Sequence, residues 1–434
     1  MNIIKSLLSC LLAVIFVGSC SKDAVMEDLQ LQLDPSFKIT NNKVLKYAHA
    51  KFGNTKGNTI DIKPICKNSD TLAYVVNYGT GWELLSGDER HTPILAKGDG
   101  FYDVENLNPG QRVWLNSEME IIQAIKNNDI IIPEQERQKN QKFWAKLQGP
   151  GSSNTKADED PIEGWELIDI MEIRSIVNTS GHIIKTRWGQ DYPWNQCVPY
   201  ASGTNVRCVA GCVAVAGAQL LKFLHDSLGK PATFYTTGLC SGYQTSPSFS
   251  FDNPSSTAWS NMALTFNESY EKLYQSALLI GWVGAEVDMV YSRTESEAYS
   301  SSFKNLLSSL LISCSYNSYN ANVAWEQIRS GIPVYIDAID LNDPTIGHAW
   351  LIDGYHILTV EYRYVYEYQK HDSPFTDYGD IKYEYEYETS NYVLMNWGWG
   401  NNVDNSLYSL TDYNGWYVQD YIFKNDKNII QLYE

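Results

Sequence analysis

The sequence has too few basic residues for a protein that binds nucleic acid. Its 434 residues contain 33 Lys and Arg against 51 Asp and Glu, which gives a formal net charge of −18 and an isoelectric point near 4.8. A surface with that excess of negative charge repels phosphate groups. The sequence therefore predicts no nucleic-acid partner.

The usual signatures of metal and nucleotide binding are also missing. No Cys-x-x-Cys occurs, and the 7 histidines do not gather at the spacing of metal ligands. The chain contains no phosphate-binding loop and no glycine-rich dinucleotide motif. We therefore expect neither a metal ion nor any other cofactor.

Beyond the N-terminus, no run reaches the ~18 consecutive apolar residues that a membrane-spanning helix needs. At the N-terminus itself, Lys5 precedes an apolar stretch from Leu7 to Val17, a pattern typical of secretory signal peptides. We expect residues 1–19 to be a signal peptide and the rest of the chain to be exported. An oxidising compartment then permits disulfides among the remaining cysteines.

The end of this segment, "VGSC", resembles the lipobox of bacterial lipoproteins, in which the cysteine is acylated after cleavage. The resemblance implies lipidation at Cys20 and a location at the outer membrane or cell surface, with release where processing removes the anchor. A plain signal peptide with an incidental Cys20 is the alternative. Apart from such a lipid anchor, the sequence predicts no contact with a membrane.

The composition indicates a globular chain of two domains. Hydrophobic residues make up 44% of the sequence, which contains 13 Trp and 30 Tyr, so there is ample material for folded cores. The stretch "GPGSSNTKADEDPIEG", residues 149–164, is rich in Gly, Ser, Asp and Pro and has no apolar period, which is typical of a linker. It separates a first unit, residues 20–148, from a second unit, residues 165–434.

Both units have the mixed helix and strand patterns of α+β folds. In the first unit, helical segments flank short strands that are divided by Gly-containing turns. In the second unit, helices come first and strand patterns fill the last hundred residues, which predicts a buried helix packed on an antiparallel sheet. The predicted helices span residues 36–52, 117–127, 133–148, 270–279 and 300–311, and a further helix begins near Cys212.

Two runs near the C-terminus, "EYRYVYEYQ" and "IKYEYEYE", alternate charged or polar residues with tyrosine around the segment "SPFTDYGD". That alternation predicts an exposed β-hairpin. Charges along such a hairpin usually protect a sheet edge and keep the protein soluble. A role in binding substrate is the alternative.

The segment "CVAGCVAVAGAQLLKF" places Cys212 at the start of a helix that is apolar on nearly every side. Gly211 precedes it, so unpaired backbone N–H groups and the positive end of the helix dipole would face the thiol. That environment favours the thiolate, the nucleophilic form of cysteine. Cysteine is also common as a buried structural residue, so the position alone does not decide between the two roles.

Three further motifs supply what a cysteine nucleophile needs. His348 opens an apolar strand in "GHAWLIDGY" and suits a general base near neutral pH. Asn396 and Trp397 follow in "MNWGWG", where an amide can orient the imidazole and an indole can shield it from water. Gln190 in "WGQDYPWN" can donate, together with the backbone N–H of Cys212, to the oxyanion of an acyl-transfer intermediate. The order Gln, Cys, His, Asn is that of papain-like peptidases.

Together these motifs resemble the streptopain family of cysteine peptidases, in its Bacteroidetes lipoprotein form. The resemblance implies a papain-like cysteine peptidase domain in which Cys212 is the nucleophile and His348 the general base and acid. It implies that Gln190 forms the oxyanion hole. Asn396 and Trp397 are then the residues that orient and shield the histidine.

The same resemblance concerns residues around substrate. It implies that the backbone of Gly347 contacts substrate, and it aligns Glu297 with a wall of the substrate pocket where the family usually has Ser or Gly. Glu297 is therefore a candidate determinant of subsite preference. The chain also has Val215, Ala216 and Gly217 where the family commonly has Thr-Ala, which we interpret as a change of packing that leaves the chemistry intact.

The stretch "GWELLSGDERHTPILA" resembles the inhibitory prodomain of this family. The resemblance implies a zymogen, in which an α+β prodomain at residues 20–148 covers the active site of residues 165–434 until the linker at 149–164 is cut. The expected activity is cysteine endopeptidase action on proteins or peptides through a Cys-His dyad and a thioester. Alternatives are a catalytically inactive surface lipoprotein that binds through its aromatic residues, or a related acyl-transfer enzyme such as an amidase or transglutaminase.

Two cysteines near the catalytic motifs are candidates for a disulfide. Cys197 and Cys208 flank the loop between the Gln190 turn and the helix that begins at Cys212, and the compartment is expected to be oxidising. A pair of buried free thiols is the alternative. The sequence leaves open whether Cys240 and Cys314 pair.

Overall fold

The structure is a computed structural model of the 434-residue chain. It describes residues 37–53, 59–148, 165–230, 259–339, 347–368, 380–400, 404–410, 417–418 and 427–433. The chain divides into two compact units, Met1–Lys38 and Ile39–Glu434, and the fold given below is that of the second unit. The expected signal peptide, the lipidation site Cys20 and the linker at 149–164 lie outside the described residues.

Helices and strands of both expected domains are present. The described α-helices are α2 (Asn41–Phe52), α3 (Pro109–Lys126), α4 (Glu134–Ala145), α5 (Cys212–Leu228), α7 (Tyr270–Glu286), α8 (Ser300–Ser309) and α9 (Ala321–Arg329), with 3-10 turns η2 (Val104–Asn106) and η3 (Lys146–Gln148). The strands are β1 (Ile60–Lys67), β2 (Asp70–Tyr78), β3 (Gly81–Ser86), β4 (Ile94–Asp99), β5 (Ile130–Ile131), β6 (Trp165–Thr179), β7 (Cys314–Ser318), β8 (Val334–Ile339), β9 (Gly347–Tyr368), β10 (Ile381–Asn396), β11 (Leu407–Ser409), β12 (Tyr417–Val418) and β13 (Asn428–Leu432). None of the helices in the described ranges is both long and apolar enough to cross a membrane.

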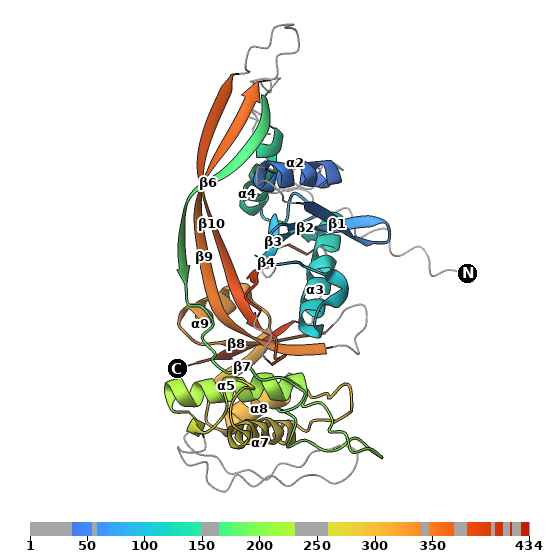
Figure 1. Cartoon of the computed structure of the whole chain (residues 1–434), viewed down its shortest axis with the longest axis vertical. Helices are drawn as coiled ribbons and strands as arrows, with labels where there is room; N and C mark the ends of the chain where they lie inside the picture. Colours follow the sequence, from blue (N-terminus) through green and yellow to red (C-terminus); the bar gives the residue numbers. More distant parts are fainter. Residues whose placement is uncertain are drawn as a thin grey trace, which may run out of the picture. The chain divides into compact units, whose positions relative to one another are not determined.

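A single antiparallel sheet runs through both expected domains (Figure 1). Its strand order is β1-β2-β3-β4-β11-β10-β9-β8-β13-β7, and β6 pairs with β9 outside this path. The junction is the short pairing of β4 with β11, in which Leu407 lies opposite Lys97 and Tyr408 opposite Ala96. We name described residues 39–148 the N-terminal region and those from 165 onward the C-terminal region. The strands of the N-terminal region are therefore joined edge to edge with those of the C-terminal region.

The C-terminal region has the predicted arrangement of a buried helix on an antiparallel sheet, and the α+β class is confirmed. Helices α5, α7 and α8 pack together on one side of that sheet (Figure 1). Helix α5 is buried along most of its length because its residues up to Leu224 are almost all small or apolar. It ends where Gly229 adopts the left-handed conformation and donates its N–H to the carbonyl of His225.

The N-terminal region owes part of its fold to the Ser-Gly-Asp-Glu-Arg stretch that the sequence singled out. Arg90 donates two parallel hydrogen bonds to the carboxylate of Asp88, from Nε at 2.9 Å and from Nη2 at 2.8 Å. The same guanidinium donates to the carbonyl of Ile125 and to the side chain of Asn128, both at 2.8 Å. Since these groups lie at the end of α3, the buried arginine ties the β3–β4 turn to that helix.

Strands β6, β9 and β10 extend well beyond the rest of the sheet, and we name this extension the arm: β6 together with residues 356–368 of β9 and 381–392 of β10 (Figure 1). The predicted hairpin of alternating tyrosines and charges is its β9–β10 part. The prediction that the hairpin is exposed is right for one face only. Tyr362, Tyr364 and Tyr366 are buried, because α2, α4 and η3 of the N-terminal region pack against the other face.

Candidate active site

The predicted nucleophile is the first residue of α5. Gly211 precedes it with φ of +86°, and a Cβ added there would lie 2.7 Å from the sulfur of Met289, so the turn into the helix requires glycine. The Cys212 side chain is half-buried against the core of α5, α7 and α8. Its thiol accepts hydrogen bonds from the backbone N–H groups of Ala349 and Val213.

The electrostatic balance at Cys212 differs from the one expected from the sequence. Burial raises the pKa of the thiol, and the N–H groups of Ala349 and Val213 oppose that rise without overcoming it. The helix N-terminus was expected to favour the thiolate, but in this structure the cost of burying a charge is larger. Cys212 therefore needs a proton acceptor beside it to become a nucleophile near neutral pH.

His348, the predicted base, is buried at the start of β9. Its Nε2 lies 2.9 Å from the backbone carbonyl oxygen of Trp397. A carbonyl can only accept, so Nε2 carries the proton and the lone pair of the neutral ring is on Nδ1. Burial lowers the pKa of His348 from 6.5 to about 4, even though the carbonyl of Trp397 acts in the opposite direction. The ring is therefore neutral at pH 7, as a general base must be.

Two indoles hold the plane of the imidazole. The Trp399 ring lies 5.9 Å from that of His348 with an interplanar angle of 8°, and the Trp350 ring lies 6.2 Å away at 14°. Trp397 itself is buried, packs 5.3 Å from Trp350 and donates its indole N–H to Asp404 at 2.8 Å. Among the described residues, the indoles stacked on the imidazole are thus those of Trp350 and Trp399, and the Trp397 ring packs on that of Trp350.

The amide of Asn396 has other partners than the histidine. It donates to the carbonyl of Thr186 at 3.4 Å and to the side chain of Gln219 at 3.3 Å, and its oxygen accepts from the N–H of Gly398 at 3.2 Å. The predicted hydrogen bond from Asn396 to His348 is absent among the described contacts, because the backbone carbonyl of the next residue occupies Nε2. Asn396 instead fixes the turn that presents that carbonyl.

Cys212 and His348 come from adjacent elements but do not touch through a hydrogen bond in the part of the chain that the structure describes. The thiol of Cys212 faces the N–H of Ala349, the residue that follows His348 on β9. The space over the imidazole is taken by Gly110, the second residue of α3. A Cβ added to Gly110 would lie 2.6 Å from Cδ2 of His348 and 2.5 Å from Cε3 of Trp397. The N-terminal region therefore packs directly on the predicted base.

Gln190 lies in a buried turn that is tied to the nucleophile segment. Its backbone carbonyl accepts the N–H of Ala210 at 2.9 Å, two residues before Cys212 enters its helix through Gly211. The N–H of Gly400 donates to the carbonyl of Trp188 at 3.0 Å, which joins the same turn to the loop after Trp397. The Gln190 turn, the start of α5 and the end of β10 thus form one connected layer.

The two residues expected near substrate are both exposed. Gly347 is the first residue of β9, directly before His348. Glu297 pairs with Val290 through two backbone hydrogen bonds of 2.8 and 3.0 Å. That loop lies beside the entrance to α5, because Ser296 donates its hydroxyl to the carbonyl of Val209 at 2.7 Å.

The sequence motifs did not point to Asp404, an acidic residue at the site. Asp404 accepts hydrogen bonds from the indole of Trp397 at 2.8 Å, from the hydroxyl of Tyr408 at 2.5 Å and from the amide of Gln111 at 3.1 Å. It therefore links α3 to the residue whose carbonyl holds His348. No motif marks an aspartate in this role, since it is defined by partners almost 300 positions apart in the chain.

The predicted disulfide is not formed in the structure, where Cys197 and Cys208 are both free thiols. The side chain of Cys197 makes a hydrogen bond with Tyr274, so it is directed to α7 instead. The loop between the two cysteines is closed by backbone hydrogen bonds, from Cys208 N to the carbonyl of Pro199 at 2.9 Å and from Ala201 N to that of Val206 at 2.8 Å. Cys314 is also a free thiol, and Cys240 lies outside the described residues.

The donor atoms that the site brings together fit acyl transfer. Across the described ranges, no three His, Cys, Asp or Glu side chains gather closely enough to hold a metal ion. What the site brings together is a thiol on a helix N-terminus, a neutral imidazole with a fixed tautomer and a glutamine in an adjoining turn.

Comparisons with known proteins identify a family and a fold. The family model described as the peptidase C10 family matches residues 188–406, which make up half of the chain. A search of curated proteins finds no match.

Among solved structures, a mutant fragment of prointerpain A from Prevotella intermedia has a similar fold. It is 20% identical, with a TM-score of 0.52, and the match covers 86% of this chain and 98% of that one. Active interpain A cysteine protease from the same organism is also 20% identical, with a TM-score of 0.40, and covers 58% of this chain and 94% of its own.

Proposed function

Because this chain belongs to the peptidase C10 family, the streptopain family of cysteine peptidases, we propose that it is a zymogen with Cys212 as nucleophile and His348 as base. One observation supports this assignment most directly. The carbonyl of Trp397 places the imidazole proton on Nε2, which leaves Nδ1 of His348 to accept the proton of a thiol. The thiol of Cys212, at the start of α5, accepts a hydrogen bond from the N–H of Ala349, the residue that follows His348 on β9.

In the proposed reaction, Nδ1 of His348 takes the thiol proton and the sulfur of Cys212 attacks the carbonyl carbon of the scissile bond. The oxyanion that forms accepts hydrogen bonds from the side chain of Gln190 and the backbone N–H of Cys212. The imidazolium then gives its proton to the leaving amine, and a thioester remains on Cys212. Water, deprotonated by His348, hydrolyses the thioester and restores the thiol. Throughout, the Nε2 hydrogen bond to Trp397 keeps the ring oriented.

Residues 20–148 act in this proposal as the inhibitory prodomain. The contact of Gly110 with His348 and Trp397 supports that role, because the first turn of α3 takes the space over the imidazole of the proposed base. Cleavage in the linker at 149–164 would then start activation. The peptidase domain comprises residues 165–434, and its substrates are proteins or peptides.

We also propose that the chain is exported and anchored at the outer membrane or cell surface through a lipid on Cys20. The support is the lipobox-like sequence at residues 17–20. Metabolic labelling with a radioactive fatty acid tests it, since label should enter the wild-type chain and not Cys20→Ser. Equal labelling of the two chains would remove the anchor from the proposal and leave the catalytic assignment untouched.

The catalytic assignment is tested with an epoxide inhibitor of cysteine peptidases and a fluorogenic peptide. After limited trypsin treatment, we expect the chain to hydrolyse the peptide and casein, and to gain one inhibitor mass on the tryptic peptide that contains Cys212. The Cys212→Ala chain is the control and should be inactive and unlabelled. Peptide hydrolysis by that variant at the wild-type rate would disprove the assignment.

A further inference from the structure

The inner face of the arm, the face covered by the N-terminal region, combines tyrosines of β9 with glutamates of β10. Tyr362 lies opposite Glu386 in the β9–β10 register, and Tyr364 lies opposite Glu384. The side chains of Tyr362, Tyr364 and Tyr366 are buried in a cluster with α2, α4 and η3. Every member of that cluster outside the arm belongs to residues 39–147.

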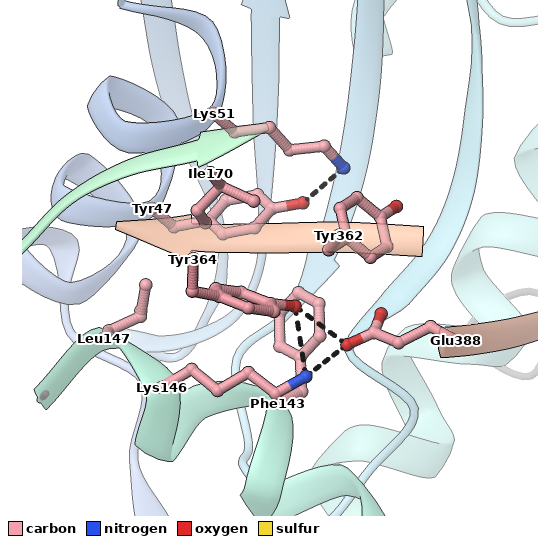
Figure 2. A pocket seen from close by; sticks show the side chains of 9 residues that line it. All are labelled: Tyr47, Lys51, Phe143, Lys146, Leu147, Ile170, Tyr362, Tyr364 and Glu388. Atoms are coloured by element: carbon pink, nitrogen blue, oxygen red, sulfur yellow. Dashed lines mark hydrogen bonds and ion pairs between the residues drawn. The ribbon is translucent and has the colours of Figure 1, made fainter. Parts of the chain in front are cut away.

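Lys146 of the N-terminal region contacts three side chains of this face, two glutamates and one tyrosine. The ammonium of Lys146 lies 2.6 Å from a carboxylate oxygen of Glu386 and forms a second ion pair with Glu388. It donates to the hydroxyl of Tyr364 at 3.0 Å and lies 4.6 Å from the centre of the same ring (Figure 2). Two carboxylates and one aromatic face thus hold a single cation.

A second lysine approaches the next tyrosine of the strand. Lys51 of α2 lies 5.9 Å from the ring centre of Tyr362, and it pairs with Glu83 at 2.9 Å. Tyr362 and Tyr364 are two residues apart on one face, which corresponds to roughly 7 Å along a strand. Two basic side chains therefore lie over two successive tyrosines of the arm.

The lysines border a narrow pocket between the two regions (Figure 2). Its lining from the arm consists of Ile170, Tyr362, Tyr364 and Glu388, and its lining from the N-terminal region consists of Tyr47, Lys51, Phe143, Lys146 and Leu147. On the opposite face of the arm, Tyr383, Tyr385 and Tyr387 are open to solvent in the described structure. The inner face is therefore the part of the arm whose surface becomes newly available if the N-terminal region leaves.

From these contacts we propose that the inner face of the arm is a docking site for a lysine-rich segment of a protein substrate, occupied by the prodomain lysines until activation. This inference rests on the proposed function, because it requires an active peptidase from which the prodomain has been removed. The surface suits a cationic and partly apolar polypeptide. Its carboxylates repel phosphate groups, so an anionic membrane or a nucleic acid would not be held there.

The position of the face decides which substrates can use it. Tyr362 follows His348 by 14 residues of continuous strand, which corresponds to roughly 45 Å. A short peptide in the catalytic site cannot reach that far, but an extended or folded protein can. The docking site should therefore raise the rate on long lysine-rich proteins and have no effect on small peptides, as expected for a second binding contact on one chain.

The test compares the trypsin-activated wild-type enzyme with the activated double variant Glu386→Gln, Glu388→Gln, each at equal concentrations of active sites titrated with the epoxide inhibitor. The substrates are a lysine-rich protein, the same protein with its lysines acetylated, and a short fluorogenic peptide. We expect the variant to lose about tenfold in kcat/KM on the unmodified protein, as for loss of a good charge contact. On the acetylated protein and on the peptide, the two enzymes should differ less than about twofold.

Glu361→Gln is the matched control, because Glu361 lies on the opposite face of the arm beside Tyr387. It should behave as the wild type on all three substrates. Equal kcat/KM of the double variant and the wild type on the unmodified protein would overturn the inference. So would a loss of the same size on the acetylated protein, since the face would then not select lysine. Failure of the wild type to cleave the short peptide would instead count against the proposed function.

Discussion

Gly110 lies so close to His348 that a Cβ on the glycine would come within 2.6 Å of the imidazole Cδ2. The two residues are joined by packing alone, and each is connected to Trp397: Gly110 touches its ring, and His348 bonds its carbonyl. The first turn of α3 thus rests on the residue that sets the histidine tautomer. Substituting the glycine perturbs this contact without altering any group that takes part in the proposed chemistry.

We expect Gly110→Ala to loosen the N-terminal region from the peptidase domain. The added methyl group meets Trp397 at 2.5 Å and His348 at 2.6 Å, so α3 must shift, and overpacking of this kind costs roughly 1–3 kcal/mol. The uncut variant should unfold at lower urea concentration than the wild type and hydrolyse a fluorogenic peptide faster. Arg112→Ala, an exposed change in the same turn, is the control. Unchanged stability and activity in Gly110→Ala would contradict the contact.

Acid should weaken the uncut chain through His348. The folded chain binds a proton at His348 only near pH 4, whereas an unfolded chain binds it near pH 6.5. The unfolded state therefore holds more protons between these values, and the stability present above pH 6.5 is lost as pH falls through that window. At pH 4.5 the free energy of unfolding should be about 2–3 kcal/mol lower than at pH 7 because of His348, as measured by urea unfolding of the Cys212→Ala chain.

The His348→Gln, Cys212→Ala chain isolates this effect, because glutamine does not titrate and its amide can still donate to the Trp397 carbonyl. Its stability should fall less between pH 7 and pH 4.5 than that of the Cys212→Ala chain. His91 and His356, whose pKa values are also lowered by burial, remain in both chains and cancel in the comparison. Identical pH profiles would mean that His348 is not buried as a neutral ring.

Much of the fold follows from local patterns, and what was missed depends on distant partners. The helices expected at residues 270–279 and 300–311 are α7 and α8, and Cys212 begins α5 as expected. These helices could be predicted because the spacing of their apolar residues is a local signal, present within each helical segment. Strand β6 was not expected, since its pairing partner β9 lies almost two hundred residues further along the chain. The burial of Tyr364 was missed for the same reason, as its cover comes from residues before the linker.

The candidate site divides in a similar way. The residue types and their order predict roles for Cys212, His348 and Gln190, because each motif carries its own chemistry. The acceptor of the His348 proton is a main-chain carbonyl, and no side-chain motif encodes a backbone acceptor. The pKa of Cys212 was also misjudged, since the helix N-terminus is visible in the sequence while the burial that outweighs it is a tertiary property.

Cys212 should react slowly with iodoacetamide in the uncut chain and faster after activation. Burial raises the pKa of the thiol in the uncut chain, and no hydrogen bond to His348 is formed among the described residues. Pairing with the imidazole after prodomain removal would lower that pKa, and we expect alkylation at pH 6.5 to become at least about tenfold faster. Cys66, an exposed thiol, serves as the internal reference in the uncut chain. Equal rates for Cys212 before and after activation would refute the expected change.

Gln190→Ala should lower kcat on the order of 10²-fold, the effect of removing one oxyanion donor, while the affinity for substrate changes little. The fold should survive, since the turn is held by the backbone hydrogen bond between Gln190 and Ala210, which alanine retains. Gln196→Ala is the matched control, because Gln196 is a nearby glutamine whose side-chain amide donates to the carbonyl of Pro193 at 3.0 Å. A silent Gln190→Ala would move the oxyanion donor to another residue.

Linker cleavage should precede activity, and the two events should be separable. Contacts between described residues hold the N-terminal region to the rest of the chain: β4 pairs with β11, Glu118 pairs with Lys427 at 3.2 Å, and Lys146 pairs with the arm. Limited trypsin, with Lys156 as an available site, should therefore first give a nicked complex of low activity. Activity should rise as the prodomain dissociates on dilution, because cutting the tether removes its high local concentration. Gel electrophoresis measures cleavage of the linker, size-exclusion chromatography measures dissociation of the prodomain, and a fluorogenic peptide measures activity. The Cys212→Ala chain is the control, and it should be cut and should dissociate without gaining activity. Full activity of the uncut chain would disprove inhibition by the N-terminal region while leaving the catalytic residues in place.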